Sequence, residues 1–311
     1  MKKTLAVSII IVNYNTKELV MNCLKSIFEH TKDISFEVIV SDNGSKDGSV
    51  EMIKAEFPQV ILIENNENLG FGAANNRGLK IAAGKYIFYL NSDTILLNNA
   101  VKMFFDYWEN SPEKEKIGAL GCMLQDENGN YIHSFGNFPT YKGEIKTLIM
   151  QNLAIIVNQF LSFFHIQNVH KGSASCDVYT GEVDYVTGAD LFCRNNDFSK
   201  FDTRYFLYFE ETDLQYVMYK NSLKRIILDA PKIVHLVGKS NDARKESIYR
   251  YISFSSNEII VSRLLWFKKN NYKKVSFMLV YIISVLYLIH LPFLMKTRET
   301  RKRIRKIRCS L

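Results

Sequence analysis

The chain has 311 residues, 47% of them hydrophobic, and a formal net charge of +8. That is enough apolar material for a substantial core, in one large domain or two small ones. The five cysteines are scattered and form no CxxC pair, which argues against a disulfide framework and favours a reducing, intracellular setting. The positive charge is concentrated at 296–308, "KTRETRKRIRKIR", a pattern typical of a solvated or lipid-facing tail, and no nucleic-acid partner is expected.

The first third of the chain alternates short apolar runs with amphipathic segments. Two lysines precede the first run in "MKKTLAVSIIIVNYN", as in a secretory signal, but the run is short and β-branched and lacks a small-residue cleavage site, which favours a first strand. Strands are predicted at 8–12, 37–40, 60–63, 86–90 and 118–124. Helices are predicted at 17–30, 49–57, from "GFGAANNRG" to about 83, and at 100–110. This alternation is typical of an α/β protein with a parallel sheet and helices on both faces.

Three of these strands end in polar residues. In "KYIFYLNSDTIL" the apolar run 86–90 leads directly into Asn91, Ser92 and Asp93. The strands before it end in the same way, at Asn13, Tyr14 and Asn15 and at Asp42 and Asn43. Because ligands of such sheets bind beyond the carboxyl ends of the strands, we expect these groups to share one rim.

Asp93 and Asp42 are the two acids of this rim. A carboxylate at a strand end suits Mg²⁺ or Mn²⁺, which would hold a diphosphate, although many such acids only cap a turn or helix. Asp42 could accept a hydrogen bond from a nucleobase or ribose, and "DNGS" is also an excellent turn sequence. Both roles of Asp42 can hold together.

The segment "GFGAAN", from Gly70 to Asn75, has the outline of a dinucleotide-binding fingerprint. It follows a strand and opens a helix, and an acid stands at the next strand end. However, Asn75 occupies the place of the third glycine and the lead-in is long for the tight first turn. An NAD(P)-dependent dehydrogenase is therefore an alternative function with weak support.

Two acids and a histidine lie in the later part of the chain. Glu210 and Glu211 open a predicted helix in an aromatic-rich setting that would raise a carboxyl pKa and suit a general base, although acids are commonplace at helix N-termini. His235 follows a strand-like run, in a predicted loop, and is either structural or a partner of Asp93 in a metal site.

Two apolar segments fall outside the alternation. The first, about 141–170, is helical and is either a core or dimer helix or an interfacial helix in contact with lipid. The second, 275–295, is nearly uncharged and is followed by the basic tail. This combination favours contact with a membrane over a buried hairpin helix. We expect a catalytic domain at 1–240, with the first segment as an insertion, and a helical region at 241–311.

Seven motifs together resemble a known family. They occur in the family's order over about residues 7 to 240 and read "VSIIIVNYN", "VIVSDNGSKDGS", "NLGFGAANNRGL", "YIFYLNSD", "VTGADLFCR", "FDTRYFLYFEETDL" and "IVHLVGKS". The chain is similar to family 2 glycosyltransferases with the GT-A fold, of the rhamnosyltransferase-like group that builds bacterial surface polysaccharides. The resemblance implies a mixed, mostly parallel sheet and an inverting transferase of the hexosyltransferase type.

The resemblance also implies roles for particular residues. Asp93 and His235 would hold Mn²⁺ or Mg²⁺, Glu211 would be the catalytic base with Glu210 beside it, and Gly188 and Asp190 would contact the acceptor. The nucleotide-sugar pocket would be lined by Asn13, Tyr14, Asn15, Asp42, Asn43, Gly70, Asn75, Asn91 and Ser92. The donor would be a UDP, dTDP or GDP sugar. The acceptor would be a saccharide, lipid-linked in view of the apolar segment, used at the cytoplasmic face of the cell membrane by a peripheral or C-terminally anchored enzyme.

The chain departs from the family pattern at several of these positions. Asn91 replaces the first acid of the DxD-type motif, which leaves one carboxylate for the metal. Glu211 stands where Asp is common, Asp190 where apolar residues are frequent, and Asn75 where relatives often carry Arg. The single carboxylate keeps a third function open, that of a non-catalytic scaffold with the same fold, tethered at the membrane.

Overall fold

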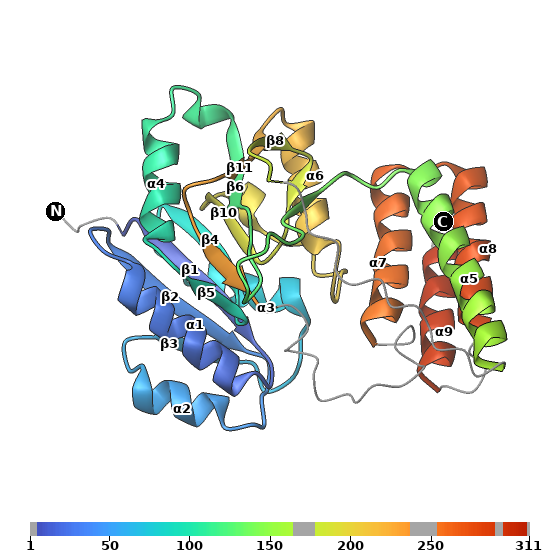
Figure 1. Cartoon of the computed structure of the whole chain (residues 1–311), viewed down its shortest axis with the longest axis horizontal. Helices are drawn as coiled ribbons and strands as arrows, with labels where there is room; N and C mark the ends of the chain where they lie inside the picture. The colour runs from blue at the N-terminus through green and yellow to red at the C-terminus, as the bar shows by residue number, and fades with distance from the viewer. Residues whose placement is uncertain (1–4, 164–177, 237–253, 290–294, 310–311) are drawn as a thin grey trace. The chain divides into compact units, whose positions relative to one another are not determined.

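A computed structural model describes residues 5–163, 178–236, 254–289 and 295–309. The chain forms two compact units (Figure 1). The α/β unit contains the described residues of 5–138, 178–206 and 210–236. The helical unit contains those of 139–163, 207–209, 254–289 and 295–309.

The α/β unit is built on an eight-stranded sheet with the strand order β3-β2-β1-β4-β10-β6-β11-β8. Its strands are β1 (Val7–Asn13), β2 (Phe36–Asp42), β3 (Ile61–Glu64), β4 (Tyr86–Asn91), β6 (Ile117–Cys122), β8 (Gly181–Val183), β10 (Asp190–Arg194) and β11 (Lys224–Leu228). Neighbouring strands are parallel except that β10 runs antiparallel to β4 and β6, and β8 antiparallel to β11. The sheet is thus mixed and mostly parallel. Its register places Asn13 beside Asp42, and Val12 beside Asn91.

Helices cover both faces of this sheet. On one face α1 (Lys17–His30), α2 (Ser49–Glu56) and α4 (Ala100–Asn110) pack on strand residues such as Ile9 and Ile11. On the other face α6 (Glu210–Lys220) and the end of α3 (Phe71–Leu79) pack on Ile10 and its neighbours. The alternation of side chains along each strand explains why every residue of the run 9–11 is apolar and fully buried.

Short elements complete the α/β unit. They are β5 (Thr94–Leu96) paired with β12 (Ile233–His235), β7 (Phe135–Gly136) paired with β9 (Tyr185–Val186), and the 3₁₀ turns η1 (Lys114–Lys116) and η2 (Asp197–Ser199). The prediction of a loop around His235 was wrong, because His235 is the last residue of β12 and pairs with Thr94 of β5. Two- and three-residue strands are too short to leave a periodic pattern in the sequence.

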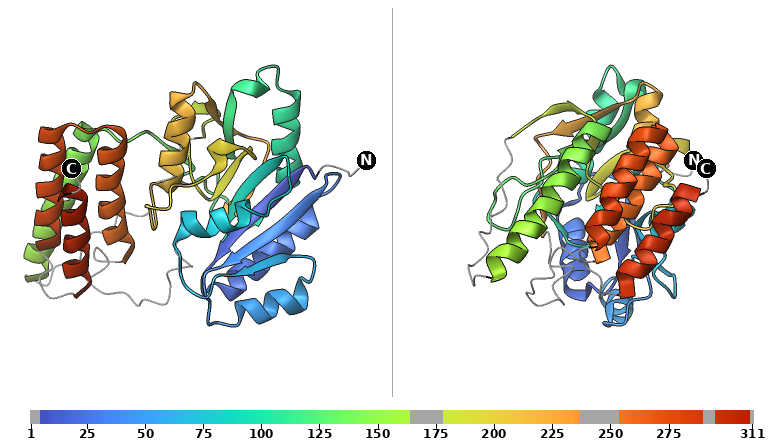
Figure 2. Two further views of the ribbon diagram at one scale, coloured as in Figure 1. Left: turned by 180° about the vertical axis from the view of Figure 1, so that it is seen from behind. Right: turned by 90° about the vertical axis from the view of Figure 1, so that its right-hand side faces the viewer.

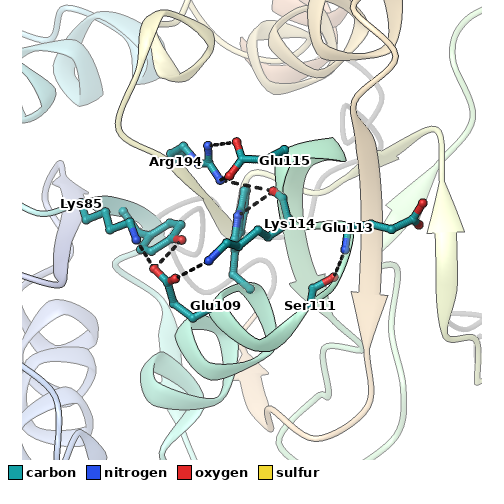
Figure 3. Close-up of polar contacts among 9 residues, drawn as sticks. Lys85, Glu109, Ser111, Glu113, Lys114, Glu115 and Arg194 are labelled. Atoms are coloured by element: carbon teal, nitrogen blue, oxygen red, sulfur yellow. Dashed lines mark hydrogen bonds and ion pairs between the residues drawn. The ribbon is translucent and has the colours of Figure 1, made fainter.

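A network of charged side chains ties the end of α4 to the sheet (Figure 3). Glu109 is paired with Lys85 and Lys114, and it accepts a 2.9 Å hydrogen bond from the Tyr86 hydroxyl. Nearby, Arg194 of β10 forms a forked ion pair with Glu115 at 2.6 and 3.1 Å. These contacts hold the amino end of β4, at the opposite end of that strand from Asn91.

The helical unit consists of α5 (Tyr141–Phe163), α7 (Phe254–Asn270), α8 (Lys274–Ile289) and α9 (Met295–Cys309). Within this unit α8 packs against α5 on one side and α9 on another (Figure 2). The Tyr141 ring stacks on Phe267 with 4.2 Å between centroids, and Arg263 of α7 forms a 2.5 Å ion pair with Glu144 of α5. By these contacts α5 groups with the C-terminal helices. In the part of the chain that the structure describes, no helix is both long enough and apolar enough to cross a membrane.

Candidate active site

The ends of β1 and β2 form one hydrogen-bonded polar cluster. The Asn13 amide donates to Asp42 Oδ2 at 2.7 Å, and the Thr16 hydroxyl donates to Asn13 Oδ1 at 2.6 Å and lies 3.1 Å from the Ser92 hydroxyl. Asp42 Oδ1 accepts the N–H groups of Gly44 and Ser45 at 3.0 and 2.8 Å, as an Asx turn does. Asp42 therefore makes the turn, and its Oδ2 keeps one lone pair for a further donor.

Tyr14 and Asn15 lie at the outer side of this cluster. Tyr14 is exposed, and Asn15 has φ 54° with its side-chain oxygen accepting the N–H of Lys46 at 2.8 Å. Asn43 is buried, and its amide donates to Asn68 Oδ1 at 3.2 Å and to the carbonyl of Gly70 at 3.3 Å. Their predicted contacts with a nucleotide stay predictions, but the structure brings these side chains to the same rim as Asp42.

The glycines of "GFGAAN" have a structural role inside the protein. Gly70 has φ +86°, and a Cβ atom there would lie 2.3 Å from the carbonyl oxygen of Phe206. That close approach allows the next N–H, of Phe71, to donate to the same oxygen at 2.9 Å. Asn75 is buried and donates to the Phe71 carbonyl at 3.2 Å. These contacts within the protein explain the glycine and asparagine of this segment without a bound dinucleotide. A diphosphate contact at Asn75 would require its buried amide to become exposed.

Asp93 lies in the turn between β4 and β5 and contacts His235. The distance from Asp93 Oδ1 to His235 Nε2 is 3.2 Å, and the Asn91 amide lies 3.4 Å from the same Nε2. The backbone fixes this pair, because the N–H of Leu236 donates to the Asp93 carbonyl at 2.8 Å. The structure thus brings together the two residues that the sequence predicted as metal ligands.

These residues fit a hard divalent cation whose remaining ligands come from a bound substrate. Asn91 Oδ1 is buried and has no hydrogen-bond partner among the described residues, so a third oxygen is available beside Asp93 and His235. The described residues contain no group of three His, Cys, Asp or Glu side chains arranged for a metal. Mg²⁺ and Mn²⁺ sites commonly use one or two carboxylates, with substrate phosphates supplying further oxygens. We infer that the protein alone offers a partial ligand set.

Glu210 and Glu211 begin α6. Glu210 is buried, whereas Glu211 keeps part of its surface open. Burial of its carboxyl raises the pKa of Glu211 above its ordinary value, and a 3.3 Å hydrogen bond from the Thr212 hydroxyl opposes this. A carboxylate with a raised pKa is a better proton acceptor at neutral pH, and Glu211 is the more accessible of the two carboxyl groups.

The segment 186–190 connects Glu211 to the Asp93 turn. A Cβ atom on Gly188 would lie 3.5 Å from Glu211 Cβ, and the carbonyl of Ala189 accepts the N–H of Asn91 at 3.0 Å. Glu211 and Asn91, which lies two residues before Asp93, therefore contact the same short stretch of backbone. Asn91 and Ala189, which make one of these two contacts, are 98 positions apart in the sequence.

Asp190, the predicted acceptor contact beside Gly188, is enclosed by the protein. It has no exposed surface, and its Oδ2 accepts the N–H of Cys122 at 2.6 Å. Burial raises the pKa of Asp190 to about 7. A direct contact with an acceptor would require this carboxyl to become exposed, so the structure favours a structural role.

Two features of the site were missed by the sequence analysis. Gln215 of α6 bonds both backbone groups of Val186, at 2.9 and 2.8 Å, and so holds the 186–190 segment against the helix that carries Glu211. Tyr208 and Phe209, directly before Glu210, have φ 68° and 69°, a left-handed conformation that is strained for non-glycine residues and is often found at functional sites. The sequence contains no local signal for either feature.

The fold and the site define an α/β protein with carboxylates and amides gathered beyond the ends of its parallel strands. The chain belongs to glycosyl transferase family 2, whose model matches residues 8–163. It is 36% identical over 135 residues to an uncharacterized glycosyltransferase of Methanocaldococcus jannaschii, covering 42% of this chain and 46% of that protein. It is 31% identical over 158 residues to the chondroitin synthase of Escherichia coli, and the match covers 48% of this chain and 22% of that protein. The chain thus spans less than half of either relative.

Solved structures with the same fold include complexes with nucleotide sugars. The mannosyltransferase PcManGT from Pyrobaculum calidifontis, in complex with GDP-Man and Mn²⁺, matches with a TM-score of 0.51 and 13% identity over 99% of this chain and 75% of that one. Residues 1–349 of S. aureus TarS, in complex with UDP-GlcNAc, match with a TM-score of 0.52 and 14% identity over 96% and 79%. At these identities the likeness establishes the fold alone. The predictions of family 2 and of a GT-A-like mixed sheet are confirmed.

Proposed function

We propose that the protein is an inverting glycosyltransferase that moves a sugar from a nucleotide-diphosphate donor to a hydroxyl group of a saccharide acceptor. The observation that supports this proposal is that the segment 186–190 contacts both Glu211 and Asn91, and Asn91 lies two residues before Asp93. Glu211 can accept a proton and Asp93 can help to hold a diphosphate. Sugar transfer needs both groups close to the anomeric carbon of the donor. Family membership supports the same reaction type.

Glu211 acts as the general base. Its carboxylate takes the proton of the acceptor hydroxyl as that oxygen bonds to the anomeric carbon, and the bond from the anomeric carbon to the diphosphate oxygen breaks on the opposite face. Positioned general bases contribute about 10²- to 10⁴-fold to such rates. Because burial raises the pKa of Glu211, this pKa is closer to neutral than the pKa of an exposed carboxyl group.

The donor binds at the ends of β1, β2 and β4. Asp42, which the Asn13 amide orients, contacts the nucleoside once its almost fully buried carboxyl becomes accessible, and Asp93, His235 and the Asn91 amide would hold Mn²⁺ or Mg²⁺. Such an ion, when bound, supplies positive charge that stabilises the leaving diphosphate. The nucleoside is expected to be uridine, deoxythymidine or guanosine; the fold neighbours PcManGT and TarS were solved with GDP-Man and UDP-GlcNAc.

The acceptor is proposed to be a lipid-linked saccharide used in cell-surface polysaccharide synthesis. The rhamnosyltransferase-like motifs support this acceptor class, and so do the apolar and basic helices α8 and α9. These helices also support a peripheral location at the cytoplasmic face of the membrane.

The test is binding and turnover with a panel of UDP, dTDP and GDP sugars. A donor that binds the native state should raise the melting temperature, and more so with Mn²⁺ than without it. With the best donor, release of nucleoside diphosphate should fall by about 10²-fold or more in Glu211→Gln. The exposed acid Glu56 of α2 provides the matched control, Glu56→Gln, which should keep full turnover.

Two results would contradict the proposal. Donor binding without any diphosphate release, with or without acceptor, would favour a non-catalytic scaffold. Binding of NAD(P) by calorimetry in place of every nucleotide sugar would favour a dehydrogenase. Loss of turnover in Glu210→Gln but not in Glu211→Gln would keep the reaction and move the base to Glu210.

A further inference from the structure

Helix α8 presents a continuous apolar stripe to the outside of the helical unit. Val275, Leu279, Ile282 and Leu286 are 83%, 45%, 48% and 50% exposed, at the spacing of one helix face. The opposite side of α8, with Phe277, Val280 and Ser284, is fully buried. A large exposed apolar surface of this kind marks an interaction site.

Helix α5, which packs against α8, also exposes apolar side chains. The Tyr141 hydroxyl donates to the Asn271 carbonyl at 2.8 Å, so α5 begins at the same level as α8 and packs beside it (Figure 2). Along α5 four further large apolar side chains are exposed: Ile149, Met150, Leu153 and Val157. From 145 to 163 and from 274 to 289 the sequence contains no acid.

The charges around this surface are positive. The guanidinium group of Arg308 in α9 lies 5.3 Å from the centroid of the Tyr281 ring of α8, which places the end of the basic helix beside α8. Arg305 and Lys306, one turn earlier, are exposed. The acids of α5 and α7 are neutralised, since Glu144 is paired with Arg263 and Glu258 with Arg303.

We propose that the α8 stripe, with α5 beside it and the cations of α9 at its edge, is a docking surface for an anionic phospholipid bilayer. Apolar side chains enter the boundary between headgroups and acyl chains while Arg305 and Lys306 contact lipid phosphates, as in helices that lie in the membrane interface. An acid-free apolar face with cations at its edge fits an anionic lipid surface better than a second protein with mixed charges. The inference rests on the membrane location proposed above and is independent of the sugar-transfer chemistry.

The test is flotation of the full chain with vesicles of phosphatidylcholine, alone or mixed with phosphatidylglycerol. We expect binding to the mixed vesicles, weakened by added salt because the electrostatic part is screened. The double variant Ile282→Ser and Leu286→Ser should weaken binding about tenfold or more. The matched control is Ile81→Ser and Leu97→Ser in the α/β unit, where both side chains are 47% exposed, and it should bind as the unaltered chain does.

Other occupants of this face give different results. No flotation of the unaltered chain, or equal weakening by both double variants, would overturn the proposal. If the unaltered chain does not bind vesicles and light scattering shows that it is a dimer, whereas the α8 variant is a monomer, the stripe would be assigned to a second copy of the chain. Diphosphate release measured without vesicles reports separately on the catalytic proposal, and we expect it to be unchanged in the α8 variant.

Discussion

Replacement of Asp190 by asparagine tests whether this buried acid is structural or contacts the acceptor. Its Oδ2 accepts the Cys122 N–H, whereas its Oδ1 is buried and has no hydrogen-bond partner among the described residues. The raised pKa of about 7 reflects the cost of an ionised carboxyl in these surroundings. The substitution Asp190→Asn preserves the shape of the side chain, keeps an oxygen for the Cys122 N–H and removes the charge.

The size and sign of the effect follow from proton binding. The folded carboxyl binds its proton more tightly than the unfolded one, so the stability it contributes is complete below the unfolded pKa and is lost as the pH rises through about 7. Over two pH units, from about 5 to about 7, the free energy of unfolding would fall by ~2.7 kcal/mol, and relaxation of the protein around the charge makes this loss smaller. We expect the unaltered chain to lose about 1–3 kcal/mol relative to Asp190→Asn between about pH 5 and about pH 8.

Urea unfolding at both pH values measures this difference. The chain has two tryptophans, Trp108 in the α/β unit and Trp266 in the helical unit, so a Trp266→Phe background leaves fluorescence that reports on the α/β unit alone. The exposed acid Asp33 gives the control Asp33→Asn, which should follow the unaltered chain at both pH values. Identical pH dependence with and without Asp190 would refute the reasoning. A large rise in the acceptor KM with unchanged stability would instead support a direct acceptor contact.

Three further substitutions test the fold and the metal site. Gly70→Ala should lower the free energy of unfolding by about 2–4 kcal/mol, because its Cβ would meet the Phe206 carbonyl in a left-handed backbone; an unchanged urea midpoint would contradict this. Hydrogen bonding to Lys85 lowers the pKa of Glu109 to about 2, so the stability that Glu109 contributes is present above pH ~4.5 and lost as the pH falls toward 2. Glu109→Gln should therefore cost about 1 kcal/mol at neutral pH and nothing near pH 2, and an equal cost at both would argue against the ion pair. Asn91→Asp should tighten Mn²⁺ binding in the presence of nucleoside diphosphate by about tenfold in calorimetry, and weaker binding would place the ion away from β4.

The local pattern of the sequence was enough to predict the longer strands and helices of the first 124 residues, but not the short strand β5, and it predicted the rim of polar groups. Apolar runs such as 86–90 form buried strands because they can be covered on both faces, and the residue after such a run must lie at the end of its strand. Asn13, Asp42 and Asp93 were placed at that end by this reasoning alone, and the register of β1 with β2 and β4 brings their strand ends to the same level.

The assembly of the site from the later part of the chain was decided only by the tertiary structure, because it depends on contacts between residues that are distant in the sequence. The antiparallel strand β10 enters the sheet between β4 and β6, and this pairing buries Asp190, whose type alone suggested an exposed residue. The same insertion carries Gly188 to Glu211 and Ala189 to Asn91, and the pairing of β12 with β5 carries His235 to Asp93. Hydrogen bonding between strands is set by the packing of the whole unit, so no local run of residues records which strand will be its neighbour.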